Sequence, residues 1–141
     1  MGKDERLDLQ RGVIGRSVPR IEDRPLIVGQ GRFAGDLSFP RPLHMRVVRS
    51  AHAHGRLVSI DTTAARRMPG VAAVWTGKDV ADVPRIPLRE APHPQLDRYL
   101  QPVLAQGEVR YVGEPVAVVF ADDPYRAEDA AEQVVVDVEA I

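Results

Sequence analysis

A long uncharged run in the second half of the chain is the feature that most constrains its fold. Residues 115–121 carry no charge, contain three valines, and end at an Asp-Asp-Pro turn signal. An apolar run of this length between turn residues predicts a strand buried on both faces. Pro115 suits its first position, because the missing N–H removes no ladder bond there, and Gly113 permits a tight bend just before it. We therefore expect the rest of the chain to pack around residues 109–121.

Alternating apolar and polar residues predict four further strands, which we place at 43–49, 56–60, 71–76 and 134–139. In the first of these the alternation predicts that Leu43, Met45 and Val47 face a core. In the last it predicts the same for Val136 and Val138. Each strand is therefore expected to have one face that is buried and one that is not.

End signals predict two main helices. Asp61 can cap a helix over residues 62–68, which a Pro-Gly pair terminates. Asp123 and Pro124 can open a second helix over residues 124–133. Small apolar residues recur at helical spacing in the second helix and predict a stripe that packs closely on a sheet: Ala127, Ala130, Ala131 and Val134.

Residues 82–108 differ from the rest of the chain because prolines exclude a long regular element there: Pro84, Pro87, Pro92, Pro94 and Pro102. Such an excursion in a compact domain is usually functional, bound to a partner or disordered. Residues 77–81 are expected to add one helical turn, and Trp75 to be half buried. Interleaved strands and helices with irregular connections predict a small α+β domain over residues 25–141, preceded by an extended polar arm at 1–24.

Composition excludes several classes of protein. The 141 residues include no cysteine, so the chain itself can form no disulfide and hold no iron–sulfur cluster. No apolar run approaches the length of a membrane span, the N-terminus does not resemble a secretory signal, and we expect a cytoplasmic location. Basic residues predominate in the first 60 residues and acidic ones in the remainder, an asymmetry that suggests a docking face. Scattered basic residues with few aromatics do not favour nucleic-acid binding.

A glycine pattern and a pair of histidines are the most suggestive motifs for a ligand. Residues 29–34 form G-x-G-x-x-A, but Gly35 and Pro40 stop a helix from following, so we favour a glycine-rich turn over a dinucleotide site. His52 and His54 could begin a metal site. A third ligand would have to come from His44, His93 or a carboxylate, and no spacing supports one, so histidines of a loop are favoured.

Other polar residues suggest no self-contained active site. We expect paired acids to serve as helix caps or a solvated helix face: Asp122 and Asp123, Glu128 and Asp129. The serines lack the setting of an activated nucleophile: Ser17, Ser38, Ser50 and Ser59. Glu114 lies at the mouth of the buried strand, where pairing with an arginine such as Arg110 is the favoured interpretation. The residues alone therefore predict no catalytic, cofactor-binding or metal-binding residue.

Several motifs taken in order resemble a known family. They are Gly29–Phe33, Arg49–Leu57, Ser59–Asp61, Met68–Val74, Val109–Ala117 and Ala127–Glu139. Together they resemble the α/β-hammerhead domain of the xanthine dehydrogenase, aldehyde oxidase and carbon monoxide dehydrogenase family of molybdenum hydroxylases, over roughly residues 16–141. The resemblance implies an α+β hammerhead with a mixed sheet, two main helices and a long proline-rich loop.

The resemblance also implies partners and cofactors. In the complete enzyme a molybdenum–pterin cofactor oxidises the substrate, and iron–sulfur clusters pass the electrons to a flavin such as FAD. The family's catalytic glutamate and main cofactor loops match nothing in this chain, so no residue is assigned as catalytic. The implied partners are the remainder of the molybdenum-binding large subunit, the iron–sulfur subunit and the flavin subunit.

Three alternatives remain open at this stage. The chain is expected to be an N-terminal structural domain or split subunit of such an oxidoreductase, since it ends abruptly at Ile141. A stand-alone interaction module with no part in turnover is the second alternative. An independent enzyme that uses a metal at His52 and His54 is the third. The substrate of the complete enzyme is not indicated by these residues.

Overall fold

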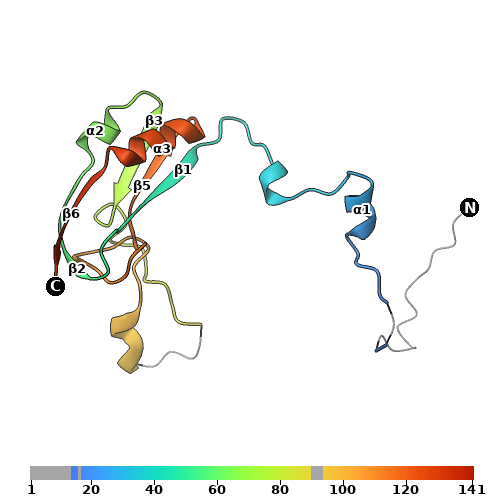
Figure 1. The fold of residues 1–141 in the computed structure, drawn as a ribbon, viewed down its shortest axis with the longest axis horizontal. Coiled ribbons are helices and arrows are strands. Elements are labelled where there is room, and N and C mark those ends of the chain that lie inside the picture. Colours follow the sequence, from blue (N-terminus) through green and yellow to red (C-terminus); the bar gives the residue numbers. More distant parts are fainter. Residues whose placement is uncertain (1–13, 16, 90–93) are drawn as a thin grey trace, which may run out of the picture. The chain divides into compact units, whose positions relative to one another are not determined.

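The computed structural model describes residues 14–15, 17–89 and 94–141, and the chain divides into two compact units between Phe39 and Pro40. The first unit contains the short helix α1 (Asp23–Ile27) and the 3₁₀ helix η2 (Ala34–Asp36) (Figure 1). Helix α1 therefore crosses the arm–domain boundary that we predicted after residue 24. That division stays a prediction, and residues 1–13 of the arm lie outside the described part.

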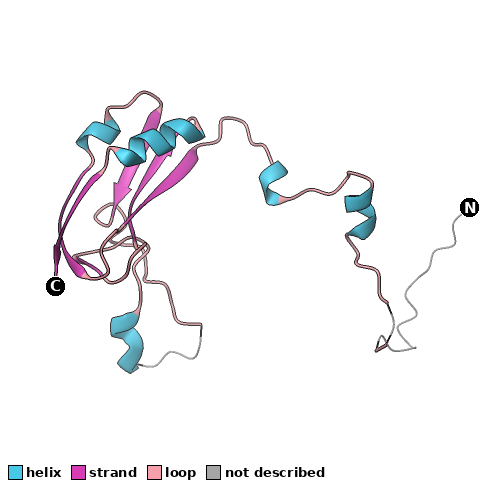
Figure 2. Cartoon of the chain, viewed as in Figure 1, coloured by secondary structure: helices cyan, strands magenta, loops and turns pink. Residues whose placement is uncertain are grey.

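The second unit contains two three-stranded sheets (Figure 2). Sheet A has the order β1-β5-β3 and consists of β1 (His44–Arg49), β5 (Pro115–Ala121) and β3 (Val71–Thr76). Sheet B has the order β4-β2-β6 and consists of β4 (Glu108–Val109), β2 (Gly55–Asp61) and β6 (Val135–Ala140). The five predicted strands are all present, and with the helices they confirm the α+β class.

The expected mixed sheet is wrong, because every strand pair of the described chain is antiparallel. Parallel pairing requires a crossover that returns the chain to the same sheet. Here α2 (Thr63–Arg66) follows β2 of sheet B and leads to β3 of sheet A, and α3 (Pro124–Glu132) follows β5 of sheet A and leads to β6 of sheet B. Each helix thus carries the chain from one sheet to the other.

Strand β5 is central in sheet A, as the uncharged run predicted. Its residues from Val116 to Val119 and Ala121 are buried, while Pro115 and Phe120 are half buried. Ala117 and Val119 pack in a core cluster with Val74 and with the small residues of the two helices. One side of β5 is covered by the helices, which pack on Ala117 and Val119. On the other side Val116 is buried against Ala105 and Val109.

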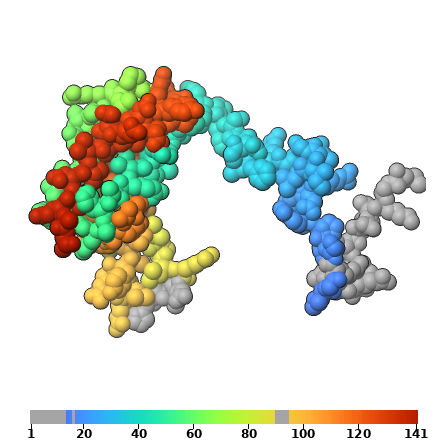
Figure 3. All heavy atoms as spheres, in the orientation of Figure 1, coloured from blue at the N-terminus to red at the C-terminus, as the bar shows by residue number. Residues whose placement is uncertain are grey.

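Helix α3 begins where its sequence signals predicted. The Asp123 carboxylate accepts hydrogen bonds from the backbone N–H groups of Tyr125 and Arg126, and Pro124 occupies the first turn. The predicted stripe is confirmed, since Ala127 and Ala130 are fully buried against sheet A. The atoms of α3 and β6 form a continuous band along one side of this unit, orange to red in Figure 3.

Helix α2 is shorter than the predicted 62–68 and covers Thr63–Arg66, followed by a turn that ends at the Pro-Gly pair. The N-cap residue is Thr62 and not the predicted Asp61, but the Asp61 carboxylate accepts a hydrogen bond from the backbone N–H of Thr63 at 2.8 Å. This hydrogen-bonding partner holds the pKa of Asp61 below its ordinary value. Only Ala65 of this helix is buried, and it packs in the core cluster with Val74 of β3.

The orientation predicted for β1 is wrong for Leu43 and Met45, which are 55% and 58% exposed. The core-facing side of this strand instead includes Val48, which pairs with Ala117 and contacts both core clusters. Arg46 shares that side and reaches Glu128 on α3. Alternation fixes which residues share a face, but only the position of α3 decides which face is covered.

The proline-rich segment between β3 and β5 is largely irregular, as predicted. It contains the 3₁₀ helix η3 (Pro94–Tyr99), a single bridge between Ile86 and Gln101, and strand β4 at its end. Residues 77–81 form turns and not the expected helical turn. The reason is local: the Asp79 carboxylate accepts hydrogen bonds from the backbone N–H and the hydroxyl of Thr76, which closes a tight turn.

Candidate functional site

The turn that precedes β5 is hydrogen-bonded to Ser50, the residue that follows β1. Ser50 and, in the turn, Glu114 are the two buried polar residues of the described chain. Backbone hydrogen bonds run from Gly113 to the Ser50 carbonyl at 2.8 Å and from Ser50 to the Glu114 carbonyl at 2.9 Å. Gly113 has a φ of +92°, the left-handed conformation that glycine favours. The bend predicted at this glycine is therefore confirmed. We call this region the Ser50–Glu114 junction.

Glu114 is 3% exposed, and its carboxylate accepts a hydrogen bond from the backbone N–H of Arg110. The expected pairing with the Arg110 side chain is wrong. That guanidinium instead donates to Glu108 at 2.9 Å, because the turn from residue 110 to 114 directs the side chain away. The hydrogen bond and charge of Arg110 hold the pKa of Glu108 below its ordinary value. Glu114 thus closes the turn, and Glu108 neutralises the arginine.

The candidate metal ligands do not converge in the described part of the chain. His52 and His54 lie in the connection between β1 and β2, and His54 Nε2 is 3.9 Å from a Glu108 carboxylate oxygen. His44 lies on β1, and His93 lies outside the described residues. No group of three or more potential ligands occurs among the residues that the structure describes. That His52 and His54 are loop residues without a metal remains a prediction.

Of the paired acids, Asp123 is the predicted helix cap and Asp129 lies on the exposed side of α3, while Asp122 and Glu128 form ion pairs. Asp123 caps α3, and Asp122 forms an ion pair with Arg126 at 3.0 Å. Glu128 reaches across to Arg46 of β1. Asp122, Asp123 and Glu128 therefore each have a structural partner within the same unit.

The serines are not placed beside a base. Ser50 Oγ accepts a hydrogen bond from the backbone N–H of His52 at 3.0 Å, and so stabilises the turn after β1. Ser59 lines the groove described below. Ser17 and Ser38 belong to the first unit and lie outside its helices. The glycine pattern from Gly29 follows helix α1, whereas a dinucleotide fingerprint follows a strand.

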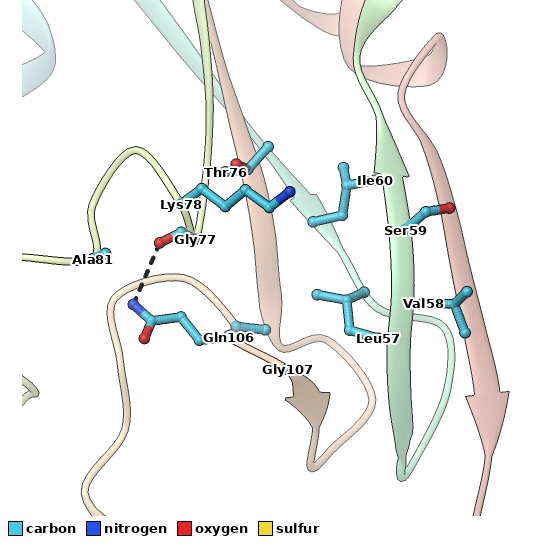
Figure 4. A pocket seen from close by; sticks show the side chains of 11 residues that line it. Leu57, Val58, Ser59, Ile60, Thr76, Gly77, Lys78, Ala81, Gln106 and Gly107 are labelled. Atoms are coloured by element: carbon cyan, nitrogen blue, oxygen red, sulfur yellow. Dashed lines mark hydrogen bonds between the residues drawn. The ribbon is translucent and has the colours of Figure 1, made fainter.

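A groove of about 410 Å³ lies between β2 and the segment 105–107 (Figure 4). Its walls are mostly apolar, with Leu57 and Ile60 on one side and Ala105 on the other. Gln106 closes it by donating to the Gly77 carbonyl at 3.4 Å, and Lys78 contributes an ammonium group. This lining has no carboxylate or imidazole beside a nucleophile, so it does not form a catalytic constellation.

The described residues do not fit a molybdenum–pterin site by themselves. Within residues 14–15, 17–89 and 94–141, no buried side-chain polar atom lacks a hydrogen-bond partner. The two buried polar side chains are both committed to the Ser50–Glu114 junction. A cofactor site that used these residues would therefore need further groups from outside the described part of the chain. No helix of the described chain has the length and apolar character to cross a membrane.

Two small antiparallel sheets, connected to each other by two short helices, define a small α+β domain. The family model for the α/β-hammerhead domain of aldehyde oxidase and xanthine dehydrogenase matches residues 28–140. The chain belongs to this hammerhead family, which occurs in the large subunits of molybdenum hydroxylases.

Curated relatives are similar over nearly the whole chain. The gamma subunit of the 6-hydroxypseudooxynicotine dehydrogenase complex of Paenarthrobacter nicotinovorans is 46% identical over 91% of this chain. The carbon monoxide dehydrogenase large chain of Afipia carboxidovorans is 39% identical over 97% of it. The chain spans 17% and 16% of the length of these two relatives.

Solved structures confirm the fold. A Cu,Mo-dependent carbon monoxide dehydrogenase matches with a TM-score of 0.78 at 37% identity, over 90% of this chain and 15% of its own. The aldehyde oxidoreductase of Desulfovibrio gigas matches with a TM-score of 0.78 at 35% identity, over 87% of this chain and 14% of its own. The hammerhead resemblance inferred from the motifs is thereby confirmed.

Proposed function

We propose that this chain is the hammerhead part of the molybdenum-binding large subunit of an oxidoreductase, and that it contributes shape and docking surface to that enzyme. The observation that most supports this proposal is the match of the hammerhead family model over residues 28–140. The chain also spans only 17% of the length of a relative with which it is 46% identical. Its buried polar groups support the proposal, because they hold turns together and, among the described residues, every buried side-chain polar atom has a hydrogen-bond partner. The reaction would be carried by groups that the rest of the subunit supplies.

The proposed partners are the remainder of the large subunit and, through it, an iron–sulfur subunit and a flavin subunit with FAD. The molybdenum–pterin cofactor would bind to the remainder, since the described residues offer no site for it. Relatives whose names state molybdenum support this, such as the xanthine dehydrogenase molybdenum-binding subunit of Escherichia coli. The protein's contribution in such enzymes is to position cofactor and substrate.

Co-expression tests this proposal. A tagged chain is purified with and without the neighbouring coding sequence for the rest of the large subunit, and molybdenum is measured in each preparation. We expect molybdenum and the oxidation of a substrate only in the co-expressed complex. A panel with nicotine, quinoline, xanthine, an aldehyde and carbon monoxide covers the substrates that the relatives' names suggest. Turnover by the chain alone would overturn the proposal.

The same experiment separates the second candidate, an interaction module without a part in turnover. Exposed apolar residues on sheet A, such as Met45 and Trp75, favour some form of docking in either case. If the chain is a structural domain of the enzyme, omitting it should prevent formation of a stable complex that contains molybdenum. An interaction module would co-purify with the complex, yet its omission would leave molybdenum content and activity unchanged.

A further inference from the structure

Sheet A has one face that helices cover and one that they do not. Ala117 and Val119 of β5 point to the covered face, where they pack with Ala130 of α3. Val118 and Phe120 alternate with them and point to the opposite face. We call this opposite side the outer face of sheet A.

Strand pairing defines which neighbours share the outer face. Val47 of β1 and Trp75 of β3 both pair with Val118, and Met45 pairs with Phe120. Partners directly opposite in an antiparallel pair project to the same side of the sheet. These five side chains therefore form one continuous patch, and none of them is charged.

Much of this patch is open to solvent. Met45 is 58% exposed and Trp75 is 46% exposed, while Val47 and Phe120 are half buried. The rings of Trp75 and Phe120 lie edge to face with centroids 4.8 Å apart, so the patch is ordered and not a set of loose side chains. Neither core cluster of the described chain includes any of these residues.

Such a face differs from what an antiparallel sheet exposes to water, where polar residues normally alternate with the buried ones. Contiguous exposed apolar residues mark interaction surfaces. Tryptophan and methionine are enriched at the centres of protein interfaces and charged residues are depleted there, which is the composition of this patch.

We propose that the outer face of sheet A is the surface on which the remainder of the molybdenum-binding subunit packs, with Trp75 as its central anchor. This rests on the proposed function: the chain spans 17% of its relative, so most of the subunit lies outside it. The occupant is an apolar segment of that remainder. It covers Met45 and Trp75 and leaves sheet B's charged outer side in contact with solvent.

A thiol-protection experiment tests this surface, because the chain contains no cysteine. Met45→Cys places one thiol on the outer face of sheet A. Val135→Cys is the matched control, since Val135 is 63% exposed and likewise lies on an edge strand, but in sheet B. Each variant is reacted with a maleimide, alone and in the co-expressed complex, and labelling is followed by the mass of this chain.

We expect both thiols to react readily in the isolated chain. In the complex, labelling of Met45→Cys slows by at least about tenfold, since a buried thiol reacts only when the interface opens, and labelling of Val135→Cys changes little. If the complex forms and Met45→Cys reacts at the same rate, this surface assignment is overturned while the proposed function stands. If no complex forms, both are overturned.

Two further outcomes name other occupants and also overturn the proposal. Protection of Met45→Cys in the isolated chain, independent of its concentration, would show that another segment of this chain covers the face. Protection in the isolated chain that rises with its concentration would show that a second copy does.

Discussion

The two sheets of the hammerhead unit share a core but expose opposite chemistry. Ile60, Val136 and Val138 point inward from sheet B and pack in the core clusters that contain residues of β5. The outer side of sheet B has an ion pair between Arg56 and Glu139, which are directly opposite each other. The outer face of sheet A has a tryptophan, a phenylalanine and a methionine in the equivalent place.

This difference shows which side of the unit is adapted to water. On its outer side sheet B mixes charged residues such as Arg56 and Glu139 with the exposed valines Val58 and Val135, and the charged residues keep that side compatible with water. Sheet A departs from that pattern on one face only, and its other face is packed against α3. A departure confined to one face indicates a surface that a partner covers, because scattered exposed apolar residues would not form a continuous patch.

The largest expected effect distinguishes the two faces of sheet A. Val119→Asp places a carboxylate in a site that is 0% exposed and leaves it without a partner, which should cost about 4 kcal/mol or more and prevent stable folding. Met45→Lys on the outer face should change the free energy of unfolding of the isolated chain by less than about 0.5 kcal/mol. Urea unfolding measures both, and equal losses would contradict the distinction.

The Ser50–Glu114 junction, where β4 of sheet B leads into β5 of sheet A, should be next in size. Glu114→Ala leaves the partly buried Arg110 N–H without its acceptor and should lower the free energy of unfolding by about 1–3 kcal/mol. Glu114→Gln keeps a hydrogen-bond acceptor of the same shape, so its free energy of unfolding should fall by less than that of the alanine variant. Equal stability of the alanine variant and the wild-type chain would show that the junction does not couple the sheets.

Assembly should depend on sheet A and not on sheet B. Met45→Lys should reduce roughly tenfold the amount of the rest of the large subunit that co-purifies with the chain. A tenfold change is equivalent to about 1.4 kcal/mol of binding free energy. Val135→Lys makes the same change on sheet B's outer side and should leave co-purification unchanged. If Val135→Lys reduces co-purification more than Met45→Lys does, sheet B and not sheet A is the docking side.

The smallest expected effect is a pH dependence of stability, to which two carboxylates of sheet B contribute. Arg110 lowers the pKa of Glu108, and hydrogen bonds from Thr63 lower that of Asp61. A lowered folded-state pKa means that the stabilisation is fully present above the ordinary pKa, 4.5 for Glu108, and is lost as the pH falls through the folded-state value. Urea unfolding from neutral to acidic pH should therefore show a loss of stability below that region.

Glu108→Gln should flatten this acid-dependent loss, because it removes one of the titrating groups. Asp129→Asn, on the exposed side of α3, is the matched control and should leave the slope as it is in the wild-type chain. An identical pH profile for Glu108→Gln and the wild-type chain would show that the pairing with Arg110 contributes nothing.

Local signals were sufficient for much of the fold. The buried strand at 115–121, the strand 71–76, the capped helix from Pro124 and the bend at Gly113 all follow from residues close together in the chain. The hammerhead assignment came from motif order and is confirmed by the family match. No local signal indicated that the helices connect different sheets, and so the expectation of a mixed sheet was wrong.

Side-chain partners and exposed faces were the least predictable features. Arg110 is near Glu114 in the chain, yet its guanidinium turns to Glu108 and only its backbone N–H meets Glu114. Leu43 and Met45 were expected in the core and are exposed. The candidate docking surface was missed for this reason, although its apolar residues at alternate positions were visible in the sequence.

The sequence by itself determined the strand and helix segments, their boundaries to within a few residues, and the family to which they belong. These depend on turn chemistry, capping and hydrophobic period, which act between neighbours in the chain. Only the tertiary structure decided that the strands form two antiparallel sheets, and which face of β1 lies beneath α3. The physical reason is that a strand has two equivalent faces, and contacts between distant segments determine which of them is buried.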